Sequence, residues 1–186
     1  AIKSYKKAIE IKSDFAEAHN NLGSALKDLE KLDDSVISFE DALALKPSFA
    51  DAHFNLGNAL KKLGHLSRAI HHFKEVINLQ PDYFKAYCDI GITLIAIGDI
   101  EKSIQYFEKA ISIKPDYAEA HNNLGSALNI LGKINMALSC FQKAITLNPN
   151  YAEAHNNLGN IFRGLKEREK ANECYEKAIS IKPDMD

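Results

Sequence analysis

Hydrophobic residues in the segment 118–151 recur at the spacing of two amphipathic helices. The first half has apolar residues three or four positions apart: Leu124, Leu128 and Leu131. In the second half the apolar residues again share one helix face: Ala137, Phe141, Ala144 and Ile145. This spacing indicates α-helix. We therefore predict helices over 118–130 and 134–147, with a left-handed cap at Gly132 and a stop at Pro149.

The two-helix pattern recurs every 34 residues along the chain. One position of the first helix is always glycine: Gly23, Gly57, Gly91, Gly125 and Gly159. Proline follows each second helix in step: Pro47, Pro81, Pro115, Pro149 and Pro183. A fixed period of this length indicates one supersecondary unit stacked on copies of itself. We predict an all-α solenoid, a single domain over 1–186, with a lone second helix in 1–15 and five full repeats: 16–49, 50–83, 84–117, 118–151 and 152–185.

Three finer features of the repeat carry structural expectations. Residues before the first helices resemble capping boxes, because an oxygen-bearing side chain precedes an acid by three residues: Asp14, Ser48, Asp116 and Asn150. Lysines are expected in the last turn of the second helix, where a cation suits the helix dipole: Lys46, Lys114 and Lys182. The interior glycines predict close helix crossings against small facing residues: Ser35, Ala69, Ser103, Ala137 and Ala171.

These positions resemble the tetratricopeptide repeat. Counted from Ala16, places seven and eight are Leu-Gly or Ile-Gly, and place twenty-four is aromatic: Phe39, Phe73, Phe107, Phe141 and Tyr175. The run Ala-Glu-Ala-His-Asn-Asn-Leu-Gly is similar to the repeat array of O-linked N-acetylglucosamine transferases and their bacterial relatives. The resemblance implies a right-handed superhelix whose first helices line a concave groove. The aromatic usual at place four survives only as Tyr87; histidine replaces it at His19, His53, His121 and His155.

Composition excludes several classes of partner. A net charge of -2 and a pI near 6.4 leave no electrostatic footprint for nucleic acid. The apolar stretches are too short for membrane insertion. The chain begins in mid-pattern, without an initiator Met or a signal peptide, and is interpreted as a fragment of a longer protein. Equivalent cysteines on neighbouring helices should be about 8–10 Å apart, too far for a disulfide. Three free thiols and a cytoplasmic location are therefore expected.

Asparagines recur on the predicted groove face of the first helices. A side-chain amide offers both a donor and an acceptor, so it can bind the backbone of an extended peptide whatever its side chains. The alternatives are that these amides bond one another or the next repeat's helix, or that they are inherited from duplication of one unit. The predicted peptide-binding residues are Asn21, Asn55, Asn58, Asp89, Asn122, Asn123, Asn156, Asn157 and Asn160.

The third repeat interrupts the amides with a more apolar strip. Its predicted members are Phe54, Lys85, Cys88, Ile92 and Ile95. An exposed apolar patch with a polar rim is a candidate specificity surface. Lateral packing inside the solenoid and neutral drift are the alternatives.

Neither catalysis nor a cofactor is indicated. No nucleophile–base pair, phosphate loop or HExxH motif occurs. The four stacked histidines should be about 10 Å apart, too far to share an ion bound at about 2 Å. We interpret them as packing residues and predict no metal site. The lysine that other tetratricopeptide modules use at place five to hold a C-terminal carboxylate is also missing.

The resulting prediction is a non-enzymatic protein–protein interaction scaffold that binds an extended polypeptide in an asparagine-lined groove. One alternative is the substrate-recognition arm of a glycosyltransferase like the O-linked N-acetylglucosamine transferases, with its catalytic domain outside this chain. Another is a self-assembling scaffold that forms homo-oligomers through its uncapped ends, since solenoids generally need polar caps.

Overall fold

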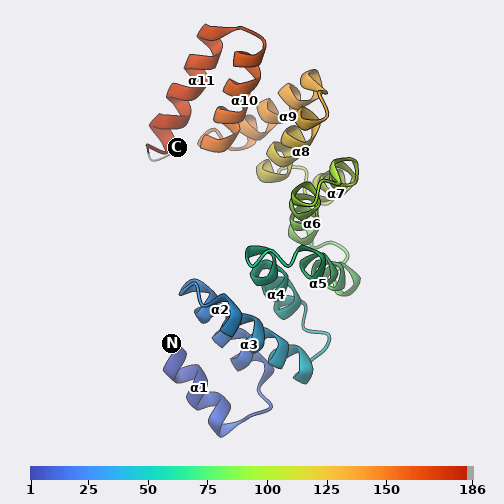
Figure 1. Cartoon of the computed structure of the whole chain (residues 1–186), viewed down its shortest axis with the longest axis vertical. Helices are drawn as coiled ribbons and strands as arrows, with labels where there is room; N and C mark the ends of the chain where they lie inside the picture. The colour runs from blue at the N-terminus through green and yellow to red at the C-terminus, as the bar shows by residue number, and fades with distance from the viewer. Residues whose placement is uncertain (184–186) are drawn as a thin grey trace. The chain divides into compact units, whose positions relative to one another are not determined.

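The computed structural model describes residues 1–183, and the regular structure in that range is helical (Figure 1). Its helices are α1 (Ile2–Ile11), α2 (Ala16–Asp28), α3 (Leu32–Leu45), α4 (Ala50–Lys62), α5 (Leu66–Leu79), α6 (Phe84–Ala96), α7 (Ile100–Ile113), α8 (Ala118–Ile130), α9 (Ile134–Leu147), α10 (Ala152–Gly164) and α11 (Arg168–Ile181). The all-α tandem-repeat fold is confirmed. The predicted end of the last repeat, at 185, lies outside the described residues.

Contacts between helices divide the chain into two compact units, Ala1–Thr93 and Leu94–Asp186. In the first unit, α2 packs against α3 and α4 against α5, while α1 and α3 pack against the first helix that follows each of them. In the second unit, α8 packs against α9 and α10 against α11, and α7 and α9 contact the following first helix in the same way. Figure 1 shows α10 and α11 side by side. Each of these four pairs, α2 with α3, α4 with α5, α8 with α9 and α10 with α11, is thus a helical hairpin.

The periodic glycine makes room for the aromatic ring of the second helix. A Cβ added at Gly57 would lie 2.6 Å from Phe73, and one added at Gly125 would lie 2.8 Å from Phe141. Gly23 and Gly159 meet Phe39 and Tyr175 at 2.7 Å in the same way. The prediction that small residues such as Ala69 face these glycines was therefore wrong. The close approach is between a backbone and a large ring, which is buried in Phe39, Phe73 and Phe141 and half-buried in Tyr175.

We expect Gly57→Ala to lower the free energy of unfolding by about 1–3 kcal/mol, the usual cost of overpacking a core. The added methyl would overlap the Phe73 ring, which is fully buried. Gly164→Ala is the matched control, since a Cβ there meets nothing within 4 Å. Urea unfolding of both variants tests the expectation, and equal stability of the two would contradict it.

The first helices begin without the predicted capping boxes. Their N-cap residues are aromatic and make no side-chain cap hydrogen bond: Phe15, Phe49, Tyr117 and Tyr151. The polar residue lies one position too early to act as the cap, and the acid lies in the first turn. The lysines also lie just beyond the second helix rather than in its last turn. Lys46 Nζ is 3.0 Å from Glu17 Oε1, and Lys182 Nζ is 3.7 Å from Glu153 Oε1. These exposed ion pairs join the end of a hairpin to its beginning.

In the second to fifth full repeats, the ring at place four ties the repeat to the preceding proline turn. Its outer N–H or O–H lies close to a backbone carbonyl six residues earlier. The distances are 2.9 Å for His53 to Pro47, 3.1 Å for Tyr87 to Pro81, and 3.0 Å for both His121 to Pro115 and His155 to Pro149. Histidine therefore replaces tyrosine here because both residues carry a donor at the far edge of a ring.

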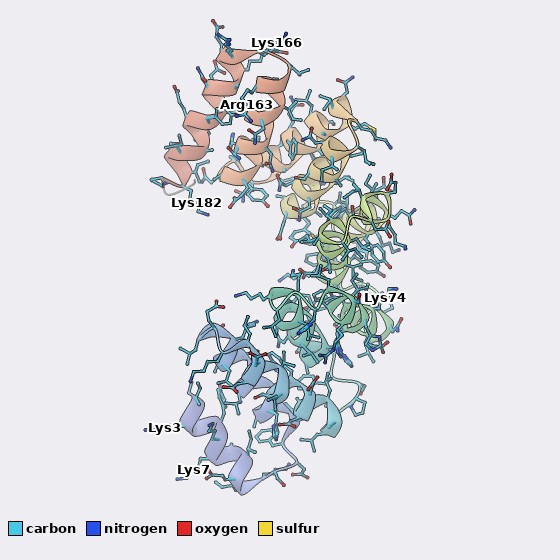
Figure 2. All side chains as sticks on the ribbon, viewed as in Figure 1. Lys3, Lys7, Lys74, Arg163, Lys166 and Lys182 are labelled. Atoms are coloured by element: carbon cyan, nitrogen blue, oxygen red, sulfur yellow. The ribbon has the colours of Figure 1, made fainter. Side chains whose placement is uncertain are left out.

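In the short loop between the two helices of a repeat, one residue adopts the left-handed backbone conformation with positive φ. Gly64, Gly98 and Gly132 have φ values of 79°, 86° and 72°, which confirms the cap predicted at Gly132. The equivalent residues Glu30 and Lys166 adopt φ values of 57° and 64° without being glycine. Figure 2 labels Lys166 at this turn, between α10 and α11. A side chain in this conformation is strained by about 1–2 kcal/mol.

Lys166→Gly should raise the free energy of unfolding by about 0.5–1 kcal/mol, since relief of the left-handed strain exceeds the entropy that glycine adds to the unfolded chain. The reverse change, Gly132→Ala, should lower it by about 1 kcal/mol. No atom lies within 4 Å of a Cβ at Gly132, so its effect reports the backbone alone. Thermal unfolding of the two variants should shift in opposite directions; shifts of the same sign would contradict the explanation.

Candidate functional site

Side-chain amides connect successive first helices within each unit. Asn55 Nδ2 donates to Asn20 Oδ1 at 3.1 Å in the first unit, and Asn157 Nδ2 donates to Asn122 Oδ1 at 3.0 Å in the second. The two acceptors are buried, with 8% and 5% of their surface exposed. The alternative in which the asparagines bond the next repeat's helix therefore holds for these pairs. Asn122 serves as an internal acceptor.

A second asparagine lies three residues after each donor, on the same helix face. In α4, Asn58 Nδ2 donates to the backbone carbonyl of Phe54 at 3.1 Å. In α10, Asn160 Oδ1 accepts from the hydroxyl of Tyr175 at 2.9 Å. Asn55, Asn58, Asn157 and Asn160 are all half-buried. We name Asn55 with Asn58, and Asn157 with Asn160, the amide pairs of the first and second units.

The other predicted members of the amide series lie in different surroundings. Asn21 is exposed, and Asn123 and Asn156 are half-buried. Asp89 forms an ion pair with Lys61. Sequence reasoning missed Lys61 and Tyr175, which hold groove residues in place. The 15-residue separation of Asn160 and Tyr175 matches a contact across one hairpin, but nothing in the residue types singles it out.

The asparagine-to-asparagine hydrogen bond between first helices is replaced, at the second and third repeats, by a different set of contacts. At the position where Asn20 and Asn122 act as acceptors, the second repeat has Phe54, which has no acceptor in its side chain. The following repeat correspondingly has Asp89, which has no donor when ionised. Instead, the Lys61 ammonium donates a hydrogen bond to the Asp89 carboxylate. The same ammonium lies 5.7 Å from the Phe73 ring centroid. Phe54 therefore needs no side-chain hydrogen bond, and Asp89 obtains its donor from Lys61 inside the first unit.

The predicted specificity strip is only partly exposed. Phe54 packs in an aromatic cluster, 5.1 Å from Tyr83 and 5.8 Å from Phe73 between ring centroids. Burial, together with the nearby carboxylates of Asp51 and Asp89, raises the pKa of the Tyr83 hydroxyl.

The remaining strip members differ widely in exposure. Cys88 is buried, with 2% of its surface exposed, so it offers no contact surface. Lys85 is exposed and Ile92 is half-buried in the first unit, and Ile95 is half-buried in the second. Lateral packing therefore accounts for Phe54 and Cys88.

In the first unit the rings of His53 and His72 are hydrogen-bonded to each other. His53 Nε2 lies 2.9 Å from the Pro47 carbonyl and must donate to it. The Nδ1 of a neutral His53 is then an acceptor, so the His72 Nδ1 3.0 Å away must carry the hydrogen. The pKa of His72 is lowered to about 4, first by burial and then by the charges of His53, His71 and Arg68. His72 is therefore held in its neutral form.

Acidification should destabilise the first unit through His72. Between the unfolded pKa of 6.5 and the folded pKa of about 4, only the unfolded chain binds the proton, so the free energy of unfolding falls as the pH falls. Because the ring is only partly buried, we expect an effect on the order of 1 kcal/mol. Urea unfolding at about pH 7.5 and about pH 5 should show a smaller pH dependence in His72→Ser, which introduces the residue found at the equivalent position, Ser38. An unchanged pH dependence would contradict this role.

The described residues offer little sign of other chemistry. No three histidine, cysteine or acidic side chains among residues 1–183 form a group that could hold a metal ion. Within the same range, no helix is both long and apolar enough to span a bilayer. The three cysteines are free thiols, and burial, with smaller contributions from Glu108 and Glu173 respectively, raises the pKa values of Cys140 and Cys174. These thiols are therefore poor nucleophiles at neutral pH.

The chain belongs to the tetratricopeptide repeat family. A family model described as Tetratricopeptide repeat matches residues 50–83, 118–151 and 152–185, and one described as TPR repeat matches residues 1–29, 23–64 and 91–129. Together they reach every predicted repeat, which confirms the family. Proteins with this fold generally mediate protein–protein interactions and are typically not enzymes.

Solved structures agree with this assignment. YrrB, described as a TPR protein with an unusual peptide-binding site, is 26% identical with a TM-score of 0.73, over 99% of this chain and 95% of that one. MamA from Desulfovibrio magneticus is 22% identical with a TM-score of 0.78, over 92% and 97%. TTC0263 from Thermus thermophilus is 23% identical with a TM-score of 0.77, over 91% and 92%. The last two show the fold alone. No curated protein matches the chain significantly.

Proposed function

We propose that each amide pair binds the backbone of an extended polypeptide segment. The observation that carries the proposal is their unused hydrogen-bonding capacity. A side-chain amide has two N–H groups and two acceptor positions. Within the protein, Asn55, Asn58 and Asn157 each donate one hydrogen bond, and Asn160 accepts one. Each pair therefore keeps N–H groups and a carbonyl for a ligand.

The internal hydrogen bonds also orient these amides in advance. Asn55 and Asn157 are each held by a buried acceptor on the preceding first helix, so little side-chain freedom remains to be lost on binding. Asn160 is held by Tyr175 in the same way. Each new hydrogen bond would contribute about 0.5–1.5 kcal/mol net. Several of them, less the cost of ordering the peptide, correspond to micromolar binding that tolerates different sequences.

The comparisons support a protein partner. Proteins of this family generally mediate protein–protein interactions, and YrrB is described as having a peptide-binding site. A further candidate is a substrate-recognition arm of a glycosyltransferase, which would use the same amide chemistry. It rests on the run Ala-Glu-Ala-His-Asn-Asn-Leu-Gly in 16–23, 118–125 and 152–159, and it stays a prediction from the sequence.

The double variant Asn58→Ala and Asn160→Ala should weaken peptide binding about tenfold or more, since it removes one contact from each amide pair. Its cost to folding should be small, because Asn58 bonds only a carbonyl of its own helix and Tyr175 is partly exposed to water. The probe is an array of unstructured peptides of varied sequence, with dissociation constants then measured by fluorescence anisotropy on the peptides that bind.

Asn78→Ala combined with Asn172→Ala is the matched control. It also removes one asparagine from each unit, but from exposed positions of the second helices α5 and α11. This control should bind like the parent chain. Equal binding by all three proteins, with circular dichroism showing intact helices, would refute the proposal.

A further inference from the structure

The rings of His53 and His72 bring two nitrogen atoms together across one hairpin. Their Nδ1 atoms are 3.0 Å apart, and the ring centroids are 5.3 Å apart. His53 belongs to α4 and is buried, while His72 belongs to α5 and is half-buried. The spacing that excludes an ion shared among the place-four histidines applies to successive repeats, whereas these two rings lie in the same repeat.

Two imidazole nitrogens at this separation match the ligand spacing around a transition-metal ion. Ring nitrogens that share an ion bound at about 2.0–2.1 Å lie about 2.8–3.4 Å apart when the angle between them at the ion is about 90–110°. The observed separation of 3.0 Å falls inside this interval. The two side chains therefore already stand at the distance that a shared ion requires.

The far side of the His53 ring is bonded as it is in a histidine that binds a metal. Its Nε2 donates to the Pro47 carbonyl at 2.9 Å, which leaves Nδ1 as the unprotonated nitrogen. A ligand histidine usually donates its other N–H to a carbonyl or carboxylate, and this bond fixes the tautomer and the orientation of the ring. His53 therefore presents a lone pair toward His72 before any ion arrives. The half-buried His72 ring has to turn so that both lone pairs meet at the ion.

The charges around the pair permit a cation. The pKa of His72 is lowered to about 4, so the ring is neutral at pH 7 and available as a ligand. Arg68 contributes to that lowering, but its guanidinium is paired with Glu40 Oε1 at 2.7 Å. Glu75 lies three residues after His72 on α5, on the same helix face, and adds a carboxylate to the surroundings.

The other repeats lack the second imidazole. In the second unit Cys140 lines a cleft on one side of α9, and Cys174 lines a cleft on the other. Each cleft also contains the place-four histidine of its repeat, His121 or His155. Two facing imidazoles are therefore a property of the second repeat, since the residues at the place of His72 in the other repeats are Ser38, Tyr106, Cys140 and Cys174.

We propose that His53 Nδ1 and His72 Nδ1 together bind a divalent transition-metal ion, and that Cu²⁺ binds most tightly. The affinity of a nitrogen site for divalent first-row ions is greatest for Cu²⁺, which also favours ligands at about 90° to one another. No group of three metal-binding side chains forms among residues 1–183, so water completes the coordination. The hydrogen on His72 Nδ1 moves to its Nε2 by exchange with water, and the ring stays neutral. The ion would cross-link α4 to α5.

The test titrates Cu²⁺ into the whole chain at about pH 7.5 by isothermal calorimetry, with two variants that use residues already present at the equivalent places. His72→Ser follows the example of Ser38, and His53→Tyr follows that of Tyr87, whose hydroxyl bonds the preceding proline turn. Each variant should bind Cu²⁺ about tenfold more weakly or worse, because one of the two protein ligands is lost. His65→Ser is the matched control, since it removes an exposed histidine at the start of α5, and it should bind like the parent chain.

Two further measurements identify the ligands. Electron paramagnetic resonance of the Cu²⁺ complex should show two nitrogen ligands in the parent chain and fewer in either variant. Saturating Cu²⁺ should raise the Tm of the parent chain and of the control more than that of the variants, because an ion bound to the folded state stabilises it. The amino terminus is the same in all four proteins, so copper bound there cancels in the comparison.

The two ligand variants change different helices, so either one decides the question if circular dichroism shows that the other is unfolded. Equal Cu²⁺ affinity in the parent chain and in a folded ligand variant would overturn the proposal. So would a loss of affinity in His65→Ser as large as that in His72→Ser, since copper binding would then reflect the number of histidines rather than this pair.

Discussion

The contact between a helix backbone and an aromatic ring governs the whole architecture. In hairpin after hairpin, an interior glycine of the first helix touches the ring of Phe39, Phe73, Phe141 or Tyr175. An alanine would hold the helices apart and leave part of the ring without contacts. Glycine in a helix costs up to about 1 kcal/mol relative to alanine. The buried ring recovers more than that, because full burial of a large apolar side chain contributes about 1.5–3 kcal/mol.

Once the hairpins are closed in this way, a few polar contacts hold successive repeats in register. The ring at place four bonds the preceding proline turn, and the Asn20–Asn55 and Asn122–Asn157 bonds join neighbouring first helices. Each of these bonds contributes only about 0.5–1.5 kcal/mol. Their geometric effect is larger, because they orient the outward-facing amides on which the proposed peptide binding depends.

Positions where one repeat departs from the others then say more about binding than the residues that all repeats share. The exchange at Phe54, Asp89 and Lys61 conserves hydrogen bonding, so it reflects packing rather than recognition. Around α9 the helix itself loses charged residues relative to α7, while Glu108 and Glu173 line the clefts on its two sides.

The sequence by itself determined the period, the helix boundaries and the family, because the 34-residue spacing and the apolar periodicity are local properties of the chain. The limits predicted for 118–130 and 134–147 agree with α8 and α9. Only the tertiary structure decided which residue faces each glycine, that Asn122 and Cys88 are buried, and that Tyr175 holds Asn160. Such pairings depend on the angle at which two helices cross and on side-chain reach. A periodic pattern places residues on a face, but it does not say which atoms across the interface they meet.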